Sequence, residues 1–394
     1  MTRKFSLMIS LIMFVGLVIT AGLLTGCSPA GEQDKTELEA YRIGAVFAVT
    51  GRAAPLGEPE KETVEMLVEE INASGGINGH KIDLYVEDTE GDETKALLAA
   101  KKLIEQKNVL AVVGPSTSGT TLAIVKTFEE AETTLVSCAA SVKIVEPIKP
   151  WVFKTPQTDR DAVSKILTYL EKEGLKKVAF INDSNAYGMS GRVEMENLAP
   201  KRGFDIVAIE SFGGTDTDMT PQLTRIKGAG AQAIICWGTN PGPAVVTRNM
   251  KQLNMDMPLF QSHGVANMKF IELAGEAAEG VMLPAGRLIV ADQLPDSDVQ
   301  KKVLQEYAKN YTDTYNKPVS TFGGHAYDSL KLVVGALEKV GADKAKIREE
   351  IENTTGFVGT GGVFNFSPEE HTGLTEEAFV MVRVENGTWK LVQD

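Results

Sequence analysis

The chain has 394 residues, of which 53 are acidic, 40 are lysine or arginine and 4 are histidine, so its formal net charge at pH 7 is -13. This acidic balance, without a basic run interleaved with aromatic residues, argues against nucleic acid as a partner. The length suits two domains of ordinary size, each able to bury its own core, and a hydrophobic content of 43% suits a soluble globular protein.

The N-terminal segment combines a basic start with a long apolar run. Arg3 and Lys4 precede the nearly uncharged residues 5–24, which are long enough to cross a bilayer as a signal-anchor helix. The order that follows favours processing instead, because small residues at Thr25 and Gly26 lead to the single cysteine Cys27 and a polar stretch.

This arrangement resembles a bacterial lipobox, in which the cysteine is lipidated and the peptide before it is removed. We therefore expect residues 1–26 to be a lipoprotein signal peptide, Cys27 to carry lipid, and residues 27–40 to form a flexible tether. Loss of Arg3 and Lys4 with the leader brings the net charge near -15. The other cysteines, Cys138 and Cys236, either pair in an oxidising compartment or, as we favour, stay as buried free thiols.

From Tyr41 onward, short apolar runs alternate with amphipathic helices, the pattern of a parallel sheet covered by crossover helices. In the first helix Val64, Leu67, Val68 and Ile71 share one face. The first unit is predicted as strands at 42–47, 81–87, 109–113 and 134–137, with helices at 60–73, 94–106 and from about 120.

A second series of the same kind follows the break at residues 153–159. It is predicted as helices at 160–173, 187–202, 219–228 and 243–253, with strands at 177–181, 206–210, 233–237, 259–261 and 281–284. The remaining helices, at 297–315, 323–340 and 345–353, are expected to return to the first unit. Asn386-Gly387 predicts a final hairpin with a type I′ turn.

The segment from Gly114 to Thr121 follows a strand and opens a helix, with the glycine spacing of a phosphate-binding loop. The lysine of that loop is missing, since Thr120 stands beside Thr121, and a nucleotide site is therefore disfavoured. Free amides at a helix start still suit one small anion such as a carboxylate. The alternative is a hydroxyl-rich turn whose side chains only cap the helix.

A second polar edge, Ser137-Cys138-Ala139-Ala140-Ser141, directly follows the next apolar strand. Ligands of open α/β sheets bind outside the carboxyl ends of the strands, so both edges are expected to converge on one anion. The four histidines show no metal-ligand spacing, and Gly-x-Ser-x-Gly, Cys-x-x-Cys and His-Glu-x-x-His are all absent. We expect no enzymatic activity, no cofactor and no metal.

Several segments resemble the type I periplasmic binding proteins of ABC transporters, in particular the branched-chain amino acid group. The most specific is Asn-x-x-Gly-Gly-x-x-Gly, which begins here at Asn72. The segments that carry the resemblance are 43–45 with 50–51, 71–79, 113–115, 183–188 and 275–280.

The resemblance implies an α/β fold of two doubly wound, Rossmann-like lobes joined by several hinge crossovers, which close on a ligand. The N-terminal lobe is expected to comprise residues 41–155 and 285–362, and the C-terminal lobe residues 156–284 and 363–394. The hinges are expected near Thr155-Pro156, Pro284 to Arg287 and Gly361 to Phe364.

The resemblance also implies the binding residues. The ligand carboxylate is expected at Ser118, the Ala139 amide and the Ser141 hydroxyl, which agrees with the anion argument above. Tyr187 of the second lobe is expected to close over the ligand, and Tyr327 of a late helix to contribute a second tyrosine.

Three departures from the family pattern bear on the ligand. His263 stands where the family has the glutamate that pairs with an α-ammonium, so an ammonium would lose its partner there. Leu56 replaces a tyrosine of the first loop, and Thr239 beside Trp237 replaces another. We therefore expect a small organic carboxylate without an α-ammonium, aromatic or aliphatic, with Trp237 and Tyr187 supplying flat surfaces.

The alternative is a branched-chain or other amino acid binder, in which a displaced acid such as Asp183 or Asp328 meets the ammonium and His263 is structural. A ligand-sensing receptor subunit is a further alternative, and a hydrolytic enzyme is a distant one. The expected partners are the ligand, the permease subunits and, through them, the ATPase. The expected location is the extracytoplasmic cell envelope, with attachment to the membrane through the lipid.

Overall fold

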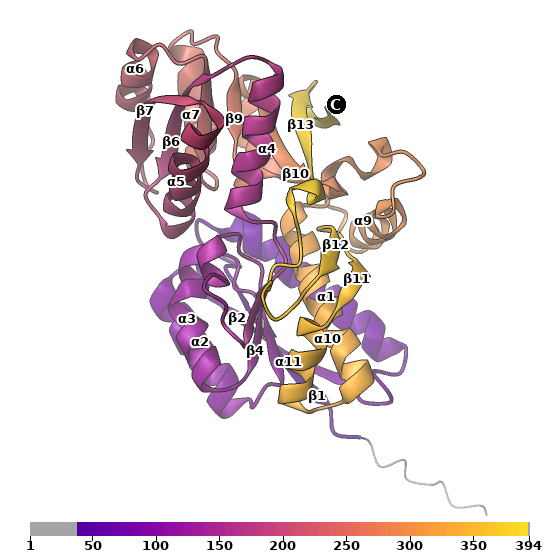
Figure 1. The fold of residues 1–394 in the computed structure, drawn as a ribbon. Coiled ribbons are helices and arrows are strands. Elements are labelled where there is room, and N and C mark those ends of the chain that lie inside the picture. The colour runs from indigo at the N-terminus through magenta and orange to yellow at the C-terminus, as the bar shows by residue number, and fades with distance from the viewer. Residues whose placement is uncertain (1–37, 393–394) are drawn as a thin grey trace, which may run out of the picture. The chain divides into compact units, whose positions relative to one another are not determined.

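The computed structural model describes residues 38–392, which form two sheets flanked by helices (Figure 1). The predicted signal peptide and Cys27 lie outside the described residues, as does most of the predicted tether. Within the described range, no helix is both long and apolar enough to cross a membrane.

The first sheet has the strand order β2-β1-β3-β4-β5, and every neighbouring pair is parallel. Its strands are β1 (Tyr41–Phe47), β2 (Ile82–Asp88), β3 (Ala111–Val113), β4 (Thr134–Ser137) and β5 (Val152–Lys154). Alternate residues point to opposite faces, so Ile43 and Ala45 enter one core while Val46 enters another. A sheet buried on both faces explains why these strands are almost continuously apolar.

Helices cover both faces of this sheet (Figure 1). The core that contains Ile43 also contains residues of α1 (Ala54–Ala73), α10 (Thr321–Val340) and α11 (Lys344–Glu352). The core that contains Val46 is covered by α2 (Glu93–Lys101), its π-helical continuation (Lys102–Gln106) and α3 (Ser118–Glu130). The late helices α10 and α11 thus pack against the first sheet.

The second sheet has the order β14-β13-β10-β9-β8-β6-β7, parallel except for the pairs β10–β13 and β13–β14. Its strands are β6 (Lys177–Asp183), β7 (Asp205–Phe212), β8 (Ala233–Trp237), β9 (Leu259–Gln261), β10 (Met282–Gly286), β13 (Phe379–Glu385) and β14 (Thr388–Leu391). On one face pack α4 (Asp159–Lys172) and α5 (Ala186–Leu198). On the other pack α6 (Thr220–Gly228), α7 (Gly242–Gln252) and α8 (Met268–Ala274). The predicted class of two doubly wound α/β lobes is confirmed.

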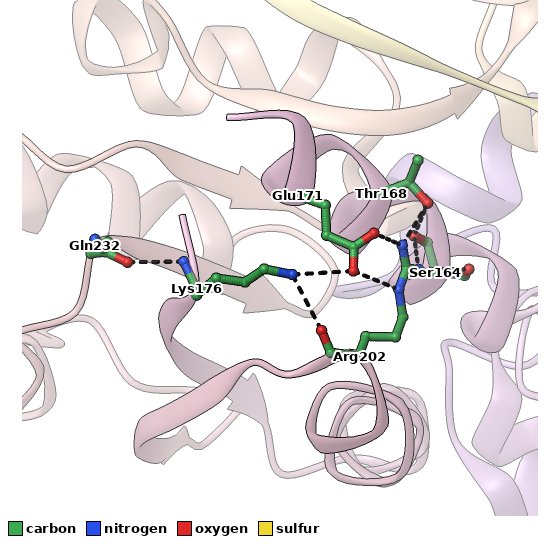
Figure 2. A network of polar contacts seen from close by, with 6 residues as sticks. All are labelled: Ser164, Thr168, Glu171, Lys176, Arg202 and Gln232. Carbon is green, nitrogen blue, oxygen red and sulfur yellow. Dashed lines mark hydrogen bonds and ion pairs between the residues drawn. The ribbon is translucent and has the colours of Figure 1, made fainter. Parts of the chain in front are cut away.

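A polar network ties α4 to the segment that follows α5 (Figure 2). Arg202 donates to Glu171 at 2.5 Å, to Thr168 Oγ1 at 3.0 Å and to the Ser164 carbonyl at 3.0 Å. Lys176 joins the same carboxylate at 3.2 Å, and the Arg202 guanidinium lowers the pKa of Glu171. The network lies apart from the cavity described below and fixes the relative position of two surface helices.

The late hairpin of β11 (Thr355–Val358) and β12 (Val363–Asn365) corrects the predicted lobe boundary. Phe364 and Phe366 are buried in the first core, and the Lys154 amide donates to the His371 carbonyl at 3.0 Å. The chain therefore stays with the first sheet until about Ala378. The predicted boundary at residue 363, and the third hinge at Gly361 to Phe364, lie too early in the chain.

Two helices begin at other residues than predicted. Helix α1 begins at Ala54 rather than at residue 60. Pro55 stands in its first turn, where the missing amide costs nothing, whereas Pro59 lies inside the helix and removes the amide that would bond to the Pro55 carbonyl. Helix α9 (Lys301–Tyr315) begins four residues later than predicted. The final hairpin turns at Asn386-Gly387 with φ of 54° and 70°, as predicted for a type I′ turn. Within the described chain, Cys138 and Cys236 are free and buried.

Candidate functional site

A cavity of about 300 Å³ opens at the carboxyl ends of strands from both sheets. Its walls come from the segments after all five strands of the first sheet, after β6, β8 and β9 of the second, and from α10. The lining residues are Arg52, Ala53, Leu56, Glu90, Gly91, Glu93, Ser116, Thr117, Ser118, Gly119, Cys138, Ala139, Ala140, Pro156, Asn185, Ala186, Tyr187, Thr239, His263, Gly264, Phe322 and His325. This is the edge at which open α/β sheets bind ligands.

The first-sheet wall is built around the N-terminus of α3. Thr117 caps the helix by accepting from the Thr120 amide at 3.4 Å, and Ser118 and Gly119 line the cavity. The Ser118 Oγ accepts from the Ser141 amide at 3.3 Å, which leaves the Ser118 hydroxyl proton free to meet a ligand. A helix N-terminus with an available hydroxyl favours a bound anion.

The second polar edge differs in part from the prediction. Ala139 lines the cavity, but its amide donates to Ser137 Oγ at 3.1 Å. Ser141 is fully buried behind the lining, and its Oγ lies 2.8 Å from Ser190 Oγ of α5. Ser141 therefore holds the Ser118 hydroxyl and links the two sheets, rather than facing the cavity itself.

Glu60 is a buried carboxyl group that the sequence reasoning missed. Ser116 lines the cavity, donates to Glu60 and accepts from the Ala48 amide at 3.0 Å. Complete burial raises the pKa of Glu60 well above its usual range, although the hydrogen bond from Ser116 opposes this. The burial of Glu60 could have been predicted from its position on the apolar face of α1, in register with Val64 and Leu67.

The second-sheet wall is aromatic. Tyr187, in the first turn of α5, accepts from the Gly264 amide at 3.1 Å and lies 3.4 Å from His263 Nδ1. The His263 ring packs edge-on against Tyr187, with 5.7 Å between centroids. Burial, with a smaller contribution from the charge of Lys154, lowers the pKa of His263 to about 3. The imidazole is therefore neutral at pH 7.

Two predicted site residues do not line the cavity. Trp237 is fully buried; its Nε1 donates to Asp159 Oδ1 at 3.3 Å, and its ring supports His263 at a centroid distance of 5.9 Å. Tyr327 packs on Tyr307, at 5.1 Å between centroids. Since His325 faces the cavity, a residue two positions later on the same helix points to the opposite side.

The two acids considered as substitutes for the family glutamate have other partners. Asp183 pairs with Arg52, an ion pair between segments that follow strands of different sheets. Asp328 accepts from the Thr360 amide at 2.6 Å and the Gly361 amide at 2.7 Å. Neither lines the cavity, so neither is placed to meet a ligand ammonium.

The carboxylates that do line the cavity are Glu90 and Glu93, both exposed. Glu90 pairs with Lys95, whereas Glu93 has no ion pair within residues 38–392. In that same range no group of three or more histidine, cysteine or acidic side chains is arranged to hold a metal.

The sequence profile described as "Periplasmic binding protein" matches residues 40–388. The chain belongs to the periplasmic binding protein family.

Similar binding proteins agree with this assignment. The leucine-, isoleucine-, valine-, threonine- and alanine-binding protein of Pseudomonas aeruginosa is 25% identical over 332 residues, which cover 82% of this chain and 85% of that protein. A Leu/Ile/Val-binding protein of Rhizobium johnstonii is also 25% identical, with coverage of 88% and 92%.

Solved structures of binding proteins match equally well. An extracellular ligand-binding receptor from Rhodopseudomonas palustris has a TM-score of 0.84 at 27% identity, covering 90% of this chain and 99% of that chain. The branched-chain amino acid transporter substrate binding protein of Streptococcus pneumoniae, solved with isoleucine, has a TM-score of 0.79 at 27% identity with the same coverage. This chain is thus a periplasmic solute-binding protein of the Leu/Ile/Val-binding type.

Proposed function

We propose that this protein captures a small organic carboxylate that lacks an α-ammonium and delivers it to the permease of an ABC importer. The observation that carries the proposal is His263, a neutral imidazole in the cavity wall where the family resemblance calls for a glutamate. A ligand ammonium would be buried there without a counter-charge, at a cost of several kcal/mol.

The first-sheet wall supports a carboxylate at the other end of the ligand. Ser118 offers its hydroxyl proton beside the N-terminus of α3, and both the hydroxyl and the helix dipole favour a negative charge. Apolar side chains such as Leu56 and Phe322 complete the lining and suit a hydrocarbon body, aromatic or aliphatic.

An amino acid ligand is the second candidate, and Glu93 is the observation that favours it. This carboxylate lies close to Gly119, at the same helix start as Ser118, and has no ion pair among the described residues. Glu93 would pair with the ligand ammonium, as the family glutamate does, but from the first-sheet wall opposite His263. The Pseudomonas and Streptococcus relatives are named for the amino acids that they bind.

Isothermal titration with leucine and 4-methylpentanoate tests the proposal, because the second compound is leucine without its ammonium. Benzoate extends the test to an aromatic acid. The described residues 38–392 belong to one compact unit, so a protein that begins at Ser28 retains the described contacts. Binding of the acids with weak or no binding of leucine supports the proposal. Binding of leucine alone overturns it, and loss of that binding in Glu93→Gln would establish the second candidate.

The proposed attachment to the membrane rests on Cys27 and the sequence before it. A full-length chain should incorporate labelled fatty acid and sediment with membranes, whereas Cys27→Ser should do neither. Incorporation of label by the Cys27→Ser chain would contradict the proposed anchor.

A further inference from the structure

Two buried imidazoles in the cavity wall have ring nitrogens without a hydrogen-bond partner in the described structure. They are His263 Nε2 and His325 Nδ1, and their side chains are 7% and 5% exposed. Buried polar atoms are nearly always hydrogen-bonded in native proteins, so two such atoms at one cavity require an explanation.

The chain's other buried histidine shows the usual outcome. His371 is fully buried, with Nδ1 at 2.9 Å from the Val152 carbonyl and Nε2 at 3.3 Å from Glu352. The partially exposed His80 also has a partner, because its Nδ1 lies 2.7 Å from the Glu39 carbonyl. Among the histidines, the unsatisfied buried nitrogens are thus confined to the two that line the cavity. Other buried atoms without a partner, such as Trp389 Nε1, belong to residues that do not line it.

These two histidines belong to different parts of the fold. His263 follows β9 of the second sheet, whereas His325 lies in the first turns of α10, which packs on the first core. The segments meet where Thr321 Oγ1 donates to the Ala266 carbonyl at 3.1 Å. A ligand group that satisfied both imidazoles would join the two parts, as contacts that stabilise a closed form must do.

The hydrogen bonds of Tyr187 indicate whether His263 Nε2 acts as a donor or an acceptor. The Tyr187 oxygen already accepts from the Gly264 amide, so its hydroxyl proton is available to His263 Nδ1 at 3.4 Å. A neutral imidazole that accepts at Nδ1 carries its proton on Nε2. His263 then presents a donor at Nε2, and His325 presents an acceptor at Nδ1 in the tautomer that carries its proton on Nε2.

We propose that the ligand carries a hydroxyl group in addition to its carboxylate, and that this hydroxyl accepts from His263 Nε2 and donates to His325 Nδ1. The inference rests on the proposed function and makes it narrower: the ligand class is hydroxy-substituted carboxylic acids. A hydroxyl is the one small neutral group that donates and accepts through a single atom.

Charged groups fit this part of the cavity poorly. Burial lowers the pKa of both histidines to about 3, so neither is a cation that would neutralise a second carboxylate. The nearby ammonium of Lys154 is fully buried and already donates to the Pro156 carbonyl at 2.5 Å. Burying a second ligand charge beside two neutral rings costs more than burying a hydroxyl that both rings satisfy.

The test compares acids with and without a hydroxyl by isothermal titration. The aliphatic pair is 4-methylpentanoate and 2-hydroxy-4-methylpentanoate, and the aromatic set is benzoate with 3- and 4-hydroxybenzoate. We expect at least one hydroxy acid to bind about tenfold or more tightly than its parent acid, since the hydroxyl satisfies two buried groups.

His263→Phe and His325→Phe keep a planar ring and remove its nitrogens. In each variant the advantage of the hydroxy acid over its parent acid should shrink to about twofold or less. A merely structural role would weaken both acids equally and leave that ratio unchanged. His80→Phe is the matched control and should keep the full advantage. Should a phenylalanine variant fail to fold, the corresponding leucine variant, which also lacks a polar group, replaces it.

Three other outcomes would each overturn the hydroxyl inference. Parent and hydroxy acids that bind equally well overturn the hydroxyl inference and leave the carboxylate proposal intact. Tightest binding of isophthalate, the dicarboxylate probe, also overturns it in favour of a second carboxylate. Binding of leucine alone, or of none of the acids, overturns the proposed function and the inference together.

Discussion

The two walls of the cavity are built by different means. The first-sheet wall consists of hydroxyls and a helix N-terminus that follow directly from the loop Gly114 to Thr121, whose polar groups mostly satisfy one another. In the second-sheet wall, the rings of Tyr187 and His263 pack against the ring of the buried Trp237. His263 Nε2 has no hydrogen-bond partner there. In the proposed function, the first wall favours an anion, whereas the second restricts which anion binds.

Removal of Trp237 should have the largest effect on stability. Trp237→Ala deletes a fully buried ring that supports the second wall, and we expect a loss of about 3 to 5 kcal/mol in the free energy of unfolding. Chemical denaturation measures it. Trp237→Phe, which keeps most of the volume, should lose less than half as much, and equal losses would show that the hydrogen bond to Asp159 matters more than packing.

Ser118→Ala should weaken every carboxylate ligand by about tenfold to a hundredfold, because it removes a hydrogen bond to a charged group worth roughly 1.5 to 3 kcal/mol. Titration against whichever acid binds the wild-type protein measures the change. Ser184→Ala, at an exposed serine, is the control and should bind normally. Unchanged affinity in Ser118→Ala would mean that the anion lies elsewhere.

The two cavity histidines, from different parts of the fold, should make the stability of the protein sensitive to acid. Their folded-state pKa is about 3, whereas an unfolded imidazole titrates near 6.5. The unfolded chain therefore takes up protons in this window that the folded chain does not. The free energy of unfolding should fall as the pH drops from 6.5 towards 3, by about 1.4 kcal/mol per pH unit for each histidine.

Buried acids also contribute to the pH dependence of the free energy of unfolding. Burial raises the pKa of Asp159 and Asp328 to about 7, so their contribution to stability rises as the pH falls, opposite to that of the histidines. The informative quantity is the difference between wild-type protein and His263→Phe, measured by denaturation at pH 7, 6 and 5. The variant should lose less stability on acidification. Parallel curves would show that His263 is protonated in the folded protein.

The ion pair of Arg52 and Asp183 spans the two walls and should have the smallest effect. Arg52 is about one-third exposed, so solvent screens the pair, and we expect Arg52→Ala to weaken ligand binding by about 1 kcal/mol or less. The loss should shrink in high salt. A loss that is independent of salt would indicate packing of the arginine side chain instead.

The polar residues of the first wall were predictable because they are local in sequence. Ser118 stands in a turn between a strand and a helix, and the strand end places it at the sheet edge without any further information. Leu56, Tyr187, Thr239 and His263 also line the cavity, as the resemblance implied. The alternation of apolar runs and amphipathic helices sufficed for the fold class.

Other features depended on contacts between distant segments. His325 reaches the cavity only because α10 returns to the first core, and Trp237 is withdrawn behind Tyr187 and His263 by its bond to Asp159. The sequence could not distinguish His325 from Tyr327 as the inward residue of α10, since both are ring side chains on one helix. The hairpin of β11 and β12 was missed because its strands are short.

By itself, the sequence determined the α/β architecture, the polar loop at Ser118 and the acidic character of the chain, because these depend on periodicity, composition and local motifs. Only the tertiary structure decided that Ser141 supports Ser118 from behind, that Glu60 is buried with a raised pKa, and that His263 and His325 share one cavity. Burial and partnership arise from packing between segments far apart in the chain, and packing determines whether a polar group is satisfied, charged or available to a ligand.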